Sequence, residues 1–530
     1  MTPIPRRVWV AIGLLLIAVN IPYLVGYLNA PEGGTFTGNA FAQTRVDYNS
    51  HLAKIQLGLR GEWLYHLLFT PEEHPAALLQ TFYTALGQIA RVTGLSPVAA
   101  YQLARLAVMV LMWVMIWQFV ARWLPEERGR WWAFLLATVT GGLGWVLYLV
   151  TPAQAADLAP IEFWLLDAYT LLTALTFPHM CAAIATLLGF TLVLDRWLAA
   201  PSWRGTGWLA LLSLILGLLQ PFDLLLTALL SLTLALIAFV RRRLAFRQLL
   251  MLTPVALVHG LVVAYDWAAF NSHPVWQVFA AQNITLSPPP IYYLLAYFWL
   301  LIPASVGLVN LWQVRDRHWL LPLVWLILVA LLLYAPLPTQ RRFLMGVQAP
   351  LAILAASGLE EWRQRWLARG WPIARWRLLL ITGLSFSTLT HALFILSAAL
   401  TANPADHPTL FLDRDTLAAQ DWLREQPVTS VVFSTFERGG EIPAFTGRRV
   451  YIGHWIETRD FAARQAQVKA FFAAEGMSDE ERLVLLETAG ADYVWYDRAA
   501  ASEGVWGPEH ADWLRPAFTA GAITIYEVKP

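Results

Sequence analysis

The sequence predicts a polytopic α-helical membrane protein with about eleven spanning helices and a small α/β domain at its C-terminal end. Of the 530 residues, 58% are hydrophobic and only 14% are charged, whereas about 25% are charged in a typical soluble domain. Long apolar runs recur up to residue 400, and arginines collect in alternate connections between them. These observations argue against a water-soluble fold and give the chain a direction across the membrane.

Eleven apolar runs are long enough to cross the roughly 30 Å of bilayer hydrocarbon. They lie near residues 8–28, 98–121, 131–150, 177–194, 206–220, 224–240, 249–269, 292–312, 319–335, 343–359 and 378–400. The first run is longer than the apolar part of a signal peptide, so we expect an uncleaved span. The fifth and sixth runs require a tight hairpin turn at residues 220–223, because polar backbone must be satisfied at membrane depth.

The arginines assign a side to each connection. With the connections numbered alternately, eighteen arginines fall on one side: Arg6, Arg7, Arg122, Arg128, Arg130, Arg196, Arg204, Arg241, Arg242, Arg243, Arg247, Arg315, Arg317, Arg363, Arg365, Arg369, Arg375 and Arg377. Short connections on the opposite side carry only Arg341 and Arg342. The positive-inside rule therefore predicts a cytoplasmic N-terminus and an extracytoplasmic C-terminal segment in the cytoplasmic (inner) membrane.

The composition changes after residue 400, which predicts two domains. Residues 1–400 form the transmembrane domain, with a large first outer loop at 29–97, and residues 401–530 form a soluble α/β domain. Runs rich in β-branched and aromatic residues predict strands at 428–435, 448–453, 491–498 and 522–528, and helical patterns alternate with them near 414–425, 460–474 and 478–489. No phosphate-binding glycine loop or nucleophile elbow occurs in this segment, so we expect support or recognition from it.

Asp47 is the main candidate for chemistry in the outer loops. It is the first carboxylate after the first span, where a short helix at the membrane surface would hold it. A carboxylate at that position can deprotonate an acceptor hydroxyl or coordinate a metal. The alternative is an ordinary solvated aspartate.

Arg341 and Arg342 are the second candidates, because the topology rule disfavours arginines on their side. A guanidinium presents a planar fork that suits phosphate oxygens, so the pair predicts a clamp for a phosphorylated lipid. Snorkelling to lipid head groups is the alternative. His179 lies just inside the outer end of the fourth span, where an ionisable residue often faces a cavity. We expect it to line the site with three others, His51, Lys54 and Glu162.

These features resemble the GT-C superfamily of membrane glycosyltransferases, especially the protein mannosyltransferase and aminoarabinose transferase families. The resemblance lies in the first outer loop with Asp47, the many spans, Arg341-Arg342 before a late span, and the outer C-terminal domain. It implies a polyprenyl-phosphate or polyprenyl-pyrophosphate sugar donor and Asp47 as catalytic base. The segment 448–458 is also similar to YfhO-like bacterial membrane proteins. The first loop lacks the family's adjacent Asp-Glu pair, which leaves a divalent metal open.

The sequence thus predicts an inverting glycosyltransferase of the bacterial cell envelope. It would move a sugar from a lipid-linked donor to a glycan, lipid or protein acceptor on the outer membrane face. The alternatives are a transporter or flippase of lipid-linked sugars, which commonly shows internal repeats that we do not find here, and a non-catalytic envelope scaffold. Net charge is +1, and no basic block suggests nucleic acid as a partner.

Overall fold

The computed structural model describes residues 2–150, 160–314, 319–504 and 506–529, which divide into two compact units. The first unit comprises Met1–Pro22, Ala104–Ala264 and Thr285–Ala399, and the second comprises Tyr23–Leu103, Tyr265–Ile284 and Leu400–Pro530. The predicted outer loop at 29–97 and the predicted C-terminal domain therefore belong to the same unit. Arg315 and Arg317 of the arginine count lie outside the described residues.

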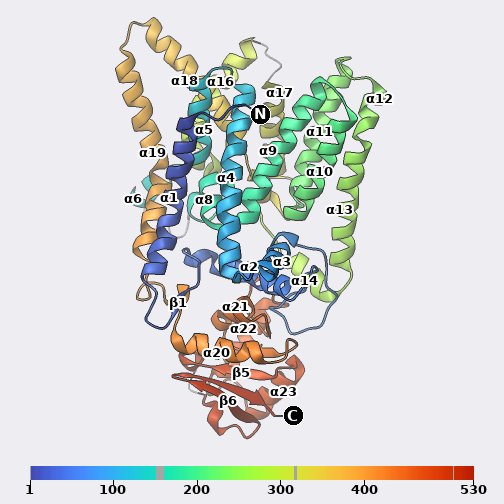
Figure 1. The fold of residues 1–530 in the computed structure, drawn as a ribbon, viewed down its shortest axis with the longest axis vertical. Helices are drawn as coiled ribbons and strands as arrows, with labels where there is room; N and C mark the ends of the chain where they lie inside the picture. The colour runs from blue at the N-terminus through green and yellow to red at the C-terminus, as the bar shows by residue number, and fades with distance from the viewer. Residues whose placement is uncertain (1, 151–159, 315–318, 505, 530) are drawn as a thin grey trace. The chain divides into compact units, whose positions relative to one another are not determined.

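Most of the first unit is helical, and the bounds of some of these helices pass those of the unit (Figure 1). Their bounds are α1 Arg6–Leu28, α4 Pro97–Trp123, α5 Glu127–Val139, α6 Gly144–Val150, α8 Thr170–Thr176, α9 Pro178–Ala199, α10 Trp203–Leu219, α11 Asp223–Val240, α12 Phe246–Leu249, α13 Thr253–Asn271, α15 Pro290–Ala296, α16 Phe298–Val314, α17 Leu320–Leu332, α18 Gln348–Ala368 and α19 Ile373–Leu400. Short 3-10 helices are η2 Ile161–Phe163, η3 Leu166–Ala168, η4 Leu250–Leu252 and η6 Gln340–Leu344.

Six helices in the described part of the chain are long and apolar enough to cross a membrane, or eight if each of two bent pairs is one span. The bent pairs are α5 with α6, at 47°, and α15 with α16, at 88°. Helices α10 and α17 are apolar but shorter, so the predicted count of eleven is not confirmed. The turn predicted at 220–223 is present, because the Asp223 backbone N–H donates to the Gln220 carbonyl oxygen at 3.1 Å.

The break between α5 and α6 leaves backbone groups without helical partners, and other elements satisfy them. The Gly141 N–H donates to the Ser387 carbonyl oxygen of α19 at 2.7 Å. The Gly144 N–H donates to the Glu162 carboxylate at 2.8 Å. Irregular backbone is tolerated at membrane depth only when its polar groups are bonded in this way.

The second unit combines short helices with a sheet. Its elements are β1 Thr35–Phe36, η1 Ala42–Thr44, α2 Arg45–Leu59, α3 Thr81–Thr93, α14 Pro274–Gln282, η7 Pro408–Leu410, β2 Phe411–Leu412, α20 Arg414–Glu425, β3 Val431–Phe433, α21 Phe436–Thr446, β4 Arg449–Val450, α22 Phe461–Phe472, α23 Asp479–Ala489, β5 Tyr493–Tyr496, α24 Arg498–Glu503, η8 Pro508–His510, β6 Leu514–Ala520 and β7 Ile523–Val528. Strands β1 and β2 pair antiparallel, with Thr35 opposite Leu412.

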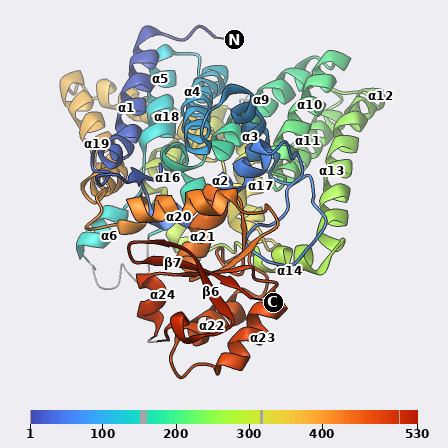
Figure 2. The same cartoon turned by 60° about the horizontal axis from the view of Figure 1, so that its bottom comes forward.

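The five-stranded sheet has the order β4-β3-β5-β7-β6 and is mixed, because β4, β3 and β5 run parallel while β7 and β6 are antiparallel. Successive side chains of a strand point to opposite faces. One face therefore carries Val432, Trp495 and Ile525, in one buried cluster, and the other carries Phe433, Val494 and Tyr526, in another. Figure 2 shows α20 and α21 on one side of the sheet and α22, α23 and α24 on the other.

Most of the elements predicted after residue 400 are present. Helix α20 has the predicted bounds, and α22 and α23 begin or end within two residues of theirs. The four predicted strands occur as the shorter β3, β4, β5 and β7. Helix α21 and strand β6 were not predicted.

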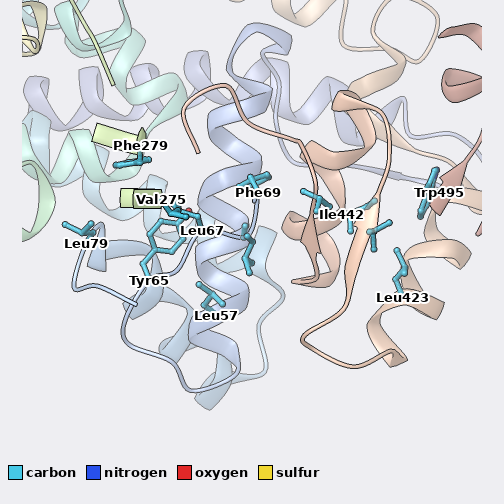
Figure 3. Packing of buried hydrophobic residues seen from close by; sticks show 14 of the residues in the cluster. Leu57, Tyr65, Leu67, Phe69, Leu79, Val275, Phe279, Leu423, Ile442 and Trp495 are labelled. Atoms are coloured by element: carbon cyan, nitrogen blue, oxygen red, sulfur yellow. The ribbon is translucent and has the colours of Figure 1, made fainter. Parts of the chain in front are cut away.

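One buried cluster joins the first outer loop to the C-terminal segment. It contains Leu57 of α2, Tyr65, Phe279 of α14, Ile442 of α21 and Trp495 of β5 (Figure 3). Helix α2 is therefore not the surface helix that we expected, since ten of its fifteen residues are buried. The first outer loop is part of a packed core.

Helix α21 and the loop after β4 approach each other so closely that only glycine fits at the contact. A Cβ atom on Gly439 would lie 1.7 Å from the Ile452 carbonyl oxygen, and one on Gly453 would lie 2.2 Å from the Gly439 carbonyl oxygen. The Thr458 hydroxyl accepts the Gly453 N–H at 3.2 Å and donates to the Phe69 carbonyl oxygen at 2.9 Å. The loop 451–458 is thereby held between α21 and the first outer loop.

We expect Gly439→Ala to destabilise the second unit, because the new methyl group would overlap backbone that cannot move aside. Overpacking of this kind typically costs about 1–3 kcal/mol. The measurement is the thermal unfolding midpoint of the purified protein. Gly207→Ala is the control, since its Cβ would meet nothing within 4 Å, and equal midpoints for the two variants would contradict the proposed tight contact.

Candidate functional site

Helix α2 gathers the polar residues of the first outer loop on one face. Asp47, Ser50, His51 and Lys54 occupy positions i, i+3, i+4 and i+7 of this helix, a spacing that aligns side chains along one side. Exposure falls steeply along this face. The Asp47 side chain is 40% exposed, whereas Lys54 is completely buried.

At the buried end of this face, Lys54 forms an ion pair with Glu457. The Lys54 Nζ lies 2.8 Å from Glu457 Oε1 and also contacts the Ser50 hydroxyl. The Ser50 hydroxyl donates to Glu457 Oε1 at 2.6 Å, and the Tyr65 hydroxyl donates to Glu457 Oε2. The Lys54 ammonium also lies 4.6 Å from the centre of the Tyr65 ring, within cation–π range. Every charged atom of the pair therefore has a partner.

The two partners of this pair respond to burial in different ways. Burial lowers the pKa of Lys54, although the nearby Glu457 carboxylate opposes that effect. Burial acts to raise the pKa of Glu457, but the Lys54 charge and the hydrogen bonds outweigh it, so the pKa of Glu457 is lowered. The carboxylate therefore stays ionised, as a buried ion pair requires.

The exposed end of the face is a contact between Asp47 and His454. Asp47 Oδ1 lies 3.5 Å from His454 Nε2. The backbone N–H groups of Ile456 and Glu457 donate to His454 Nδ1 at 3.1 and 3.2 Å. Because Nδ1 accepts these bonds, the ring proton of the neutral imidazole lies on Nε2, the nitrogen that faces Asp47. The loop that supplies Glu457 thus also orients a donor toward Asp47.

His51 packs within the aromatic core beside this face. Its ring stacks on Tyr83 at 4.1 Å, with 12° between the planes, and it is also stacked with Tyr101. Both His51 and Lys54 are buried, so their burial favours a supporting role for them over contact with substrate.

Arg341 and Arg342 lie in η6 of the first unit. Arg342 Nη1 is 3.5 Å from the Asp167 carboxylate, and Arg341 lies 4.9 Å above the centre of the Trp164 ring. Arg342 Nε is buried and has no hydrogen-bond partner among the described residues. An N–H left in this state is a donor ready for an incoming acceptor.

Asp223 completes this cluster. It is fully buried at the start of α11, interacts electrostatically with Asp167 and Arg342, and both its carboxylate oxygens lack hydrogen-bond partners within the described chain. Asp223 therefore belongs to the same group of charged residues as Asp167 and Arg342.

Glu162 and His179, the remaining predicted residues, lie elsewhere in the first unit. Glu162 is buried, and its carboxylate accepts the Gly144 N–H at the start of α6. Burial raises the pKa of Glu162, although the Gly144 bond favours the charged form. His179 is half-buried in the first turn of α9, with its ring 5.9 Å from that of Phe177. Glu162 thus stabilises the break between α5 and α6, because it accepts a backbone hydrogen bond there.

The residues near Asp47 supply few ligands for a divalent metal. Across the described ranges, no group of three or more His, Cys, Asp and Glu side chains is arranged to hold a metal ion. Asp47 and His454 supply two donor atoms, which lie 3.5 Å apart.

The sequence pointed to Asp47 as a candidate but not to its neighbours His454 and Glu457, which lie in the segment 448–458, noted only for its similarity to a family. Lys54 was the signal that the sequence offered, because a lysine on a buried helix has to be matched by a carboxylate.

We expect Lys54→Met to destabilise the protein by about 3–5 kcal/mol, because it leaves the Glu457 carboxylate buried without a counter-charge. Glu457→Gln should also destabilise, and the double variant should recover much of the loss. Thermal unfolding of the two single variants and the double variant gives the coupling. Additive losses would contradict the pairing.

Comparison of the sequence with protein-family models and with curated proteins finds no match. Solved structures do match. The oligosaccharyltransferase of Archaeoglobus fulgidus in the apo form aligns with a TM-score of 0.50 and 13% identity, over 92% of this chain and 69% of that chain. ArnT from Cupriavidus metallidurans, bound to undecaprenyl phosphate, aligns with a TM-score of 0.51 and 12% identity, over 98% of both chains.

The arabinofuranosyltransferase AftD from Mycobacteria aligns with a TM-score of 0.52 and 12% identity, over 100% of this chain and 42% of that chain. At these identities the likeness concerns the fold. Several helices in the described part of the chain are long and apolar enough to span a bilayer, so the chain is a multi-pass membrane protein. The chain therefore shares its fold with these three proteins, which agrees with the resemblance to the GT-C superfamily.

Proposed function

We propose that this protein is an inverting glycosyltransferase that moves a sugar from a polyprenyl-phosphate or polyprenyl-pyrophosphate donor to an acceptor hydroxyl or other nucleophile at the outer face of the cytoplasmic membrane. The proposal includes eleven spans, with α10, α17 and α18 as the short or more polar ones, a cytoplasmic N-terminus, and an extracytoplasmic α/β domain after residue 400. The acceptor is a glycan, a lipid or a protein.

One observation carries the proposal: Asp47 is an accessible carboxylate on a helix that is mostly buried. Its side chain is 40% exposed, while Lys54, two turns further along the same face, is locked in an ion pair. A general base has to be open to the substrate and fixed in position by its surroundings. Asp47 meets both conditions.

In the proposed reaction, Asp47 takes the proton of the acceptor hydroxyl as the acceptor oxygen attacks the anomeric carbon of the donor sugar. The bond between that carbon and the phosphate oxygen breaks, and its electron pair leaves with the lipid phosphate. Attack opposite the leaving group inverts the anomeric centre. His454 acts as a positioning residue, since its Nε2 lies 3.5 Å from Asp47 Oδ1.

Arg341 and Arg342 are the proposed ligands of the donor phosphate. The Asp167 carboxylate orients Arg342 through one terminal nitrogen, while the buried Nε has no acceptor among the described residues. A phosphate oxygen is an acceptor of the right charge for such a nitrogen. Positive charge there would stabilise the leaving phosphate. ArnT, one of the fold neighbours, was solved with undecaprenyl phosphate, which supports a polyprenyl carrier here.

We expect Asp47→Asn to lower transfer by at least about 100-fold, the usual contribution of a general base, without lowering the unfolding midpoint. The assay uses purified protein in liposomes, a panel of undecaprenyl-phosphate-linked hexoses and pentoses with a radiolabelled sugar, and envelope extract as acceptor.

Glu73→Gln is the matched control for Asp47→Asn, because Glu73 is an exposed carboxylate of the same loop whose nearest cation is 4.0 Å away. Its activity should equal that of the wild type. Full activity of Asp47→Asn would remove Asp47 from the mechanism. Movement of the labelled lipid across the bilayer without covalent transfer would instead support a transporter.

We expect Arg342→Lys to lower kcat/KM for the lipid donor by roughly tenfold, equivalent to about 1.4 kcal/mol. Lysine keeps the charge but loses the fork that can hold Asp167 and a phosphate together. Arg375→Lys, an exposed arginine on α19, is the control. An unchanged kcat/KM in Arg342→Lys would show that the fork does not bind the donor.

A further inference from the structure

A groove between helices α5, α18 and α19 lies within the first unit. It has a volume of about 620 Å³, and its lining includes Arg128 and Trp132 of α5, Arg363 of α18, and Trp376 and Arg377 of α19. A second hollow of about 340 Å³ shares Trp132 and Trp376 with it and continues along α19 to Ser387. The two hollows therefore adjoin along α19, and together they are called the groove.

The groove is polar at one end and apolar along its length. Three arginines and Glu360 lie at the polar end, and Glu360 pairs with both Arg128, at 3.0 Å, and Arg363, at 2.5 Å. Arg128 also contacts the exposed Glu126. Arg377 is exposed, and the described residues offer it no acidic partner. Positive charge at this end is thus incompletely matched by carboxylates.

The apolar part of the groove is lined by leucine, isoleucine and tryptophan side chains, including Leu359, Leu380 and Leu384. From Arg377 to Ser387 it follows ten residues of α19, which is about 15 Å at 1.5 Å per residue. That length matches about half of the roughly 30 Å hydrocarbon layer, or one leaflet.

The tryptophans indicate the depth of the polar end in the bilayer. Trp131, Trp132 and Trp376 lie beside the arginines, and tryptophan is enriched where lipid head groups meet hydrocarbon. The same arginines belong to the set that predicts the cytoplasmic side. The occupant must therefore have an anionic group at head-group level and an apolar chain that reaches one leaflet inward.

We propose that this groove is a binding site for an anionic glycerophospholipid of the cytoplasmic leaflet, with its phosphate at Arg377 and an acyl chain along α19. The arginines favour an anionic over a zwitterionic head group, because the phosphate charge of an anionic lipid is not cancelled by a cationic group in the same lipid. The site is independent of the proposed transfer reaction.

Native mass spectrometry of the delipidated full-length protein tests this proposal, with dioleoyl phosphatidylglycerol and dioleoyl phosphatidylcholine as probes. We expect the wild type to bind phosphatidylglycerol roughly tenfold more tightly, the effect of one charge-assisted contact. Arg377→Gln should remove this preference. Arg375→Gln, which alters an exposed arginine of the same helix that does not line the groove, should keep it.

A second pair of variants tests the acyl-chain part of the groove. Gly383 lines the second hollow, and a Cβ there would meet nothing within 4 Å, so Gly383→Leu fills the groove without a backbone clash. It should weaken binding of both lipids. Gly207→Leu, at an equally open glycine of α10 outside both hollows, should bind as the wild type does.

Three results would overturn the proposal. Equal binding of the two lipids by the wild type would exclude charge selection. Equal losses in Arg375→Gln and Arg377→Gln would indicate diffuse attraction to a basic surface. Tighter binding of undecaprenyl phosphate than of phosphatidylglycerol, lost in Arg377→Gln, would make the occupant a polyprenyl carrier.

Discussion

The buried pair of Lys54 and Glu457 is the constraint on which the arrangement of the second unit depends. The two residues are separated by 403 positions in sequence, and neither charge can be buried without the other. Their contact fixes α2 against the loop 451–458. The close approach at Gly439 and Gly453 makes that contact possible, because any side chain there would push the loop away from α21.

The same constraint determines the surroundings of Asp47. Asp47 precedes Lys54 by two helical turns, and His454 precedes Glu457 by three residues, so the pairing of the inner residues brings the outer ones together. The inner pair is saturated with partners, while Asp47 keeps an exposed carboxylate. One end of this helix face is therefore rigid and the other end is accessible to solvent. The proposed role of Asp47 as a base requires both properties.

Local patterns in the sequence predicted the elements whose own residues favour them. Helix α20 begins after Asp413, whose side chain caps it, and has the predicted bounds. Helix α21 was missed because Gly439, Gly440 and Pro443 are poor helix formers, and packing outweighs them here. Strand β6 was missed because it contains Pro516, which an edge strand paired only with β7 can accommodate.

The candidate site also depends on both nearby and distant parts of the sequence. Asp47 could be singled out because its position just after the first span can be read from the residues around it. Its partners could not, because His454 lies about 400 residues away and no periodicity connects the two segments. The packing of the first outer loop was not predicted either, since its mixed composition conceals that its apolar residues pack against α14 and the sheet.

Polar residues of the first unit fall into two groups that differ in how well they are satisfied. Glu162 and Ser387 bond backbone groups at the break between α5 and α6, which gives them a structural reason to be there. Arg342 Nε and the Asp223 carboxylate have no hydrogen-bond partners in the described part of the chain. Native proteins leave few buried polar groups in this state, because each costs free energy. The unsatisfied group, rather than the satisfied one, is therefore where a ligand would be bound.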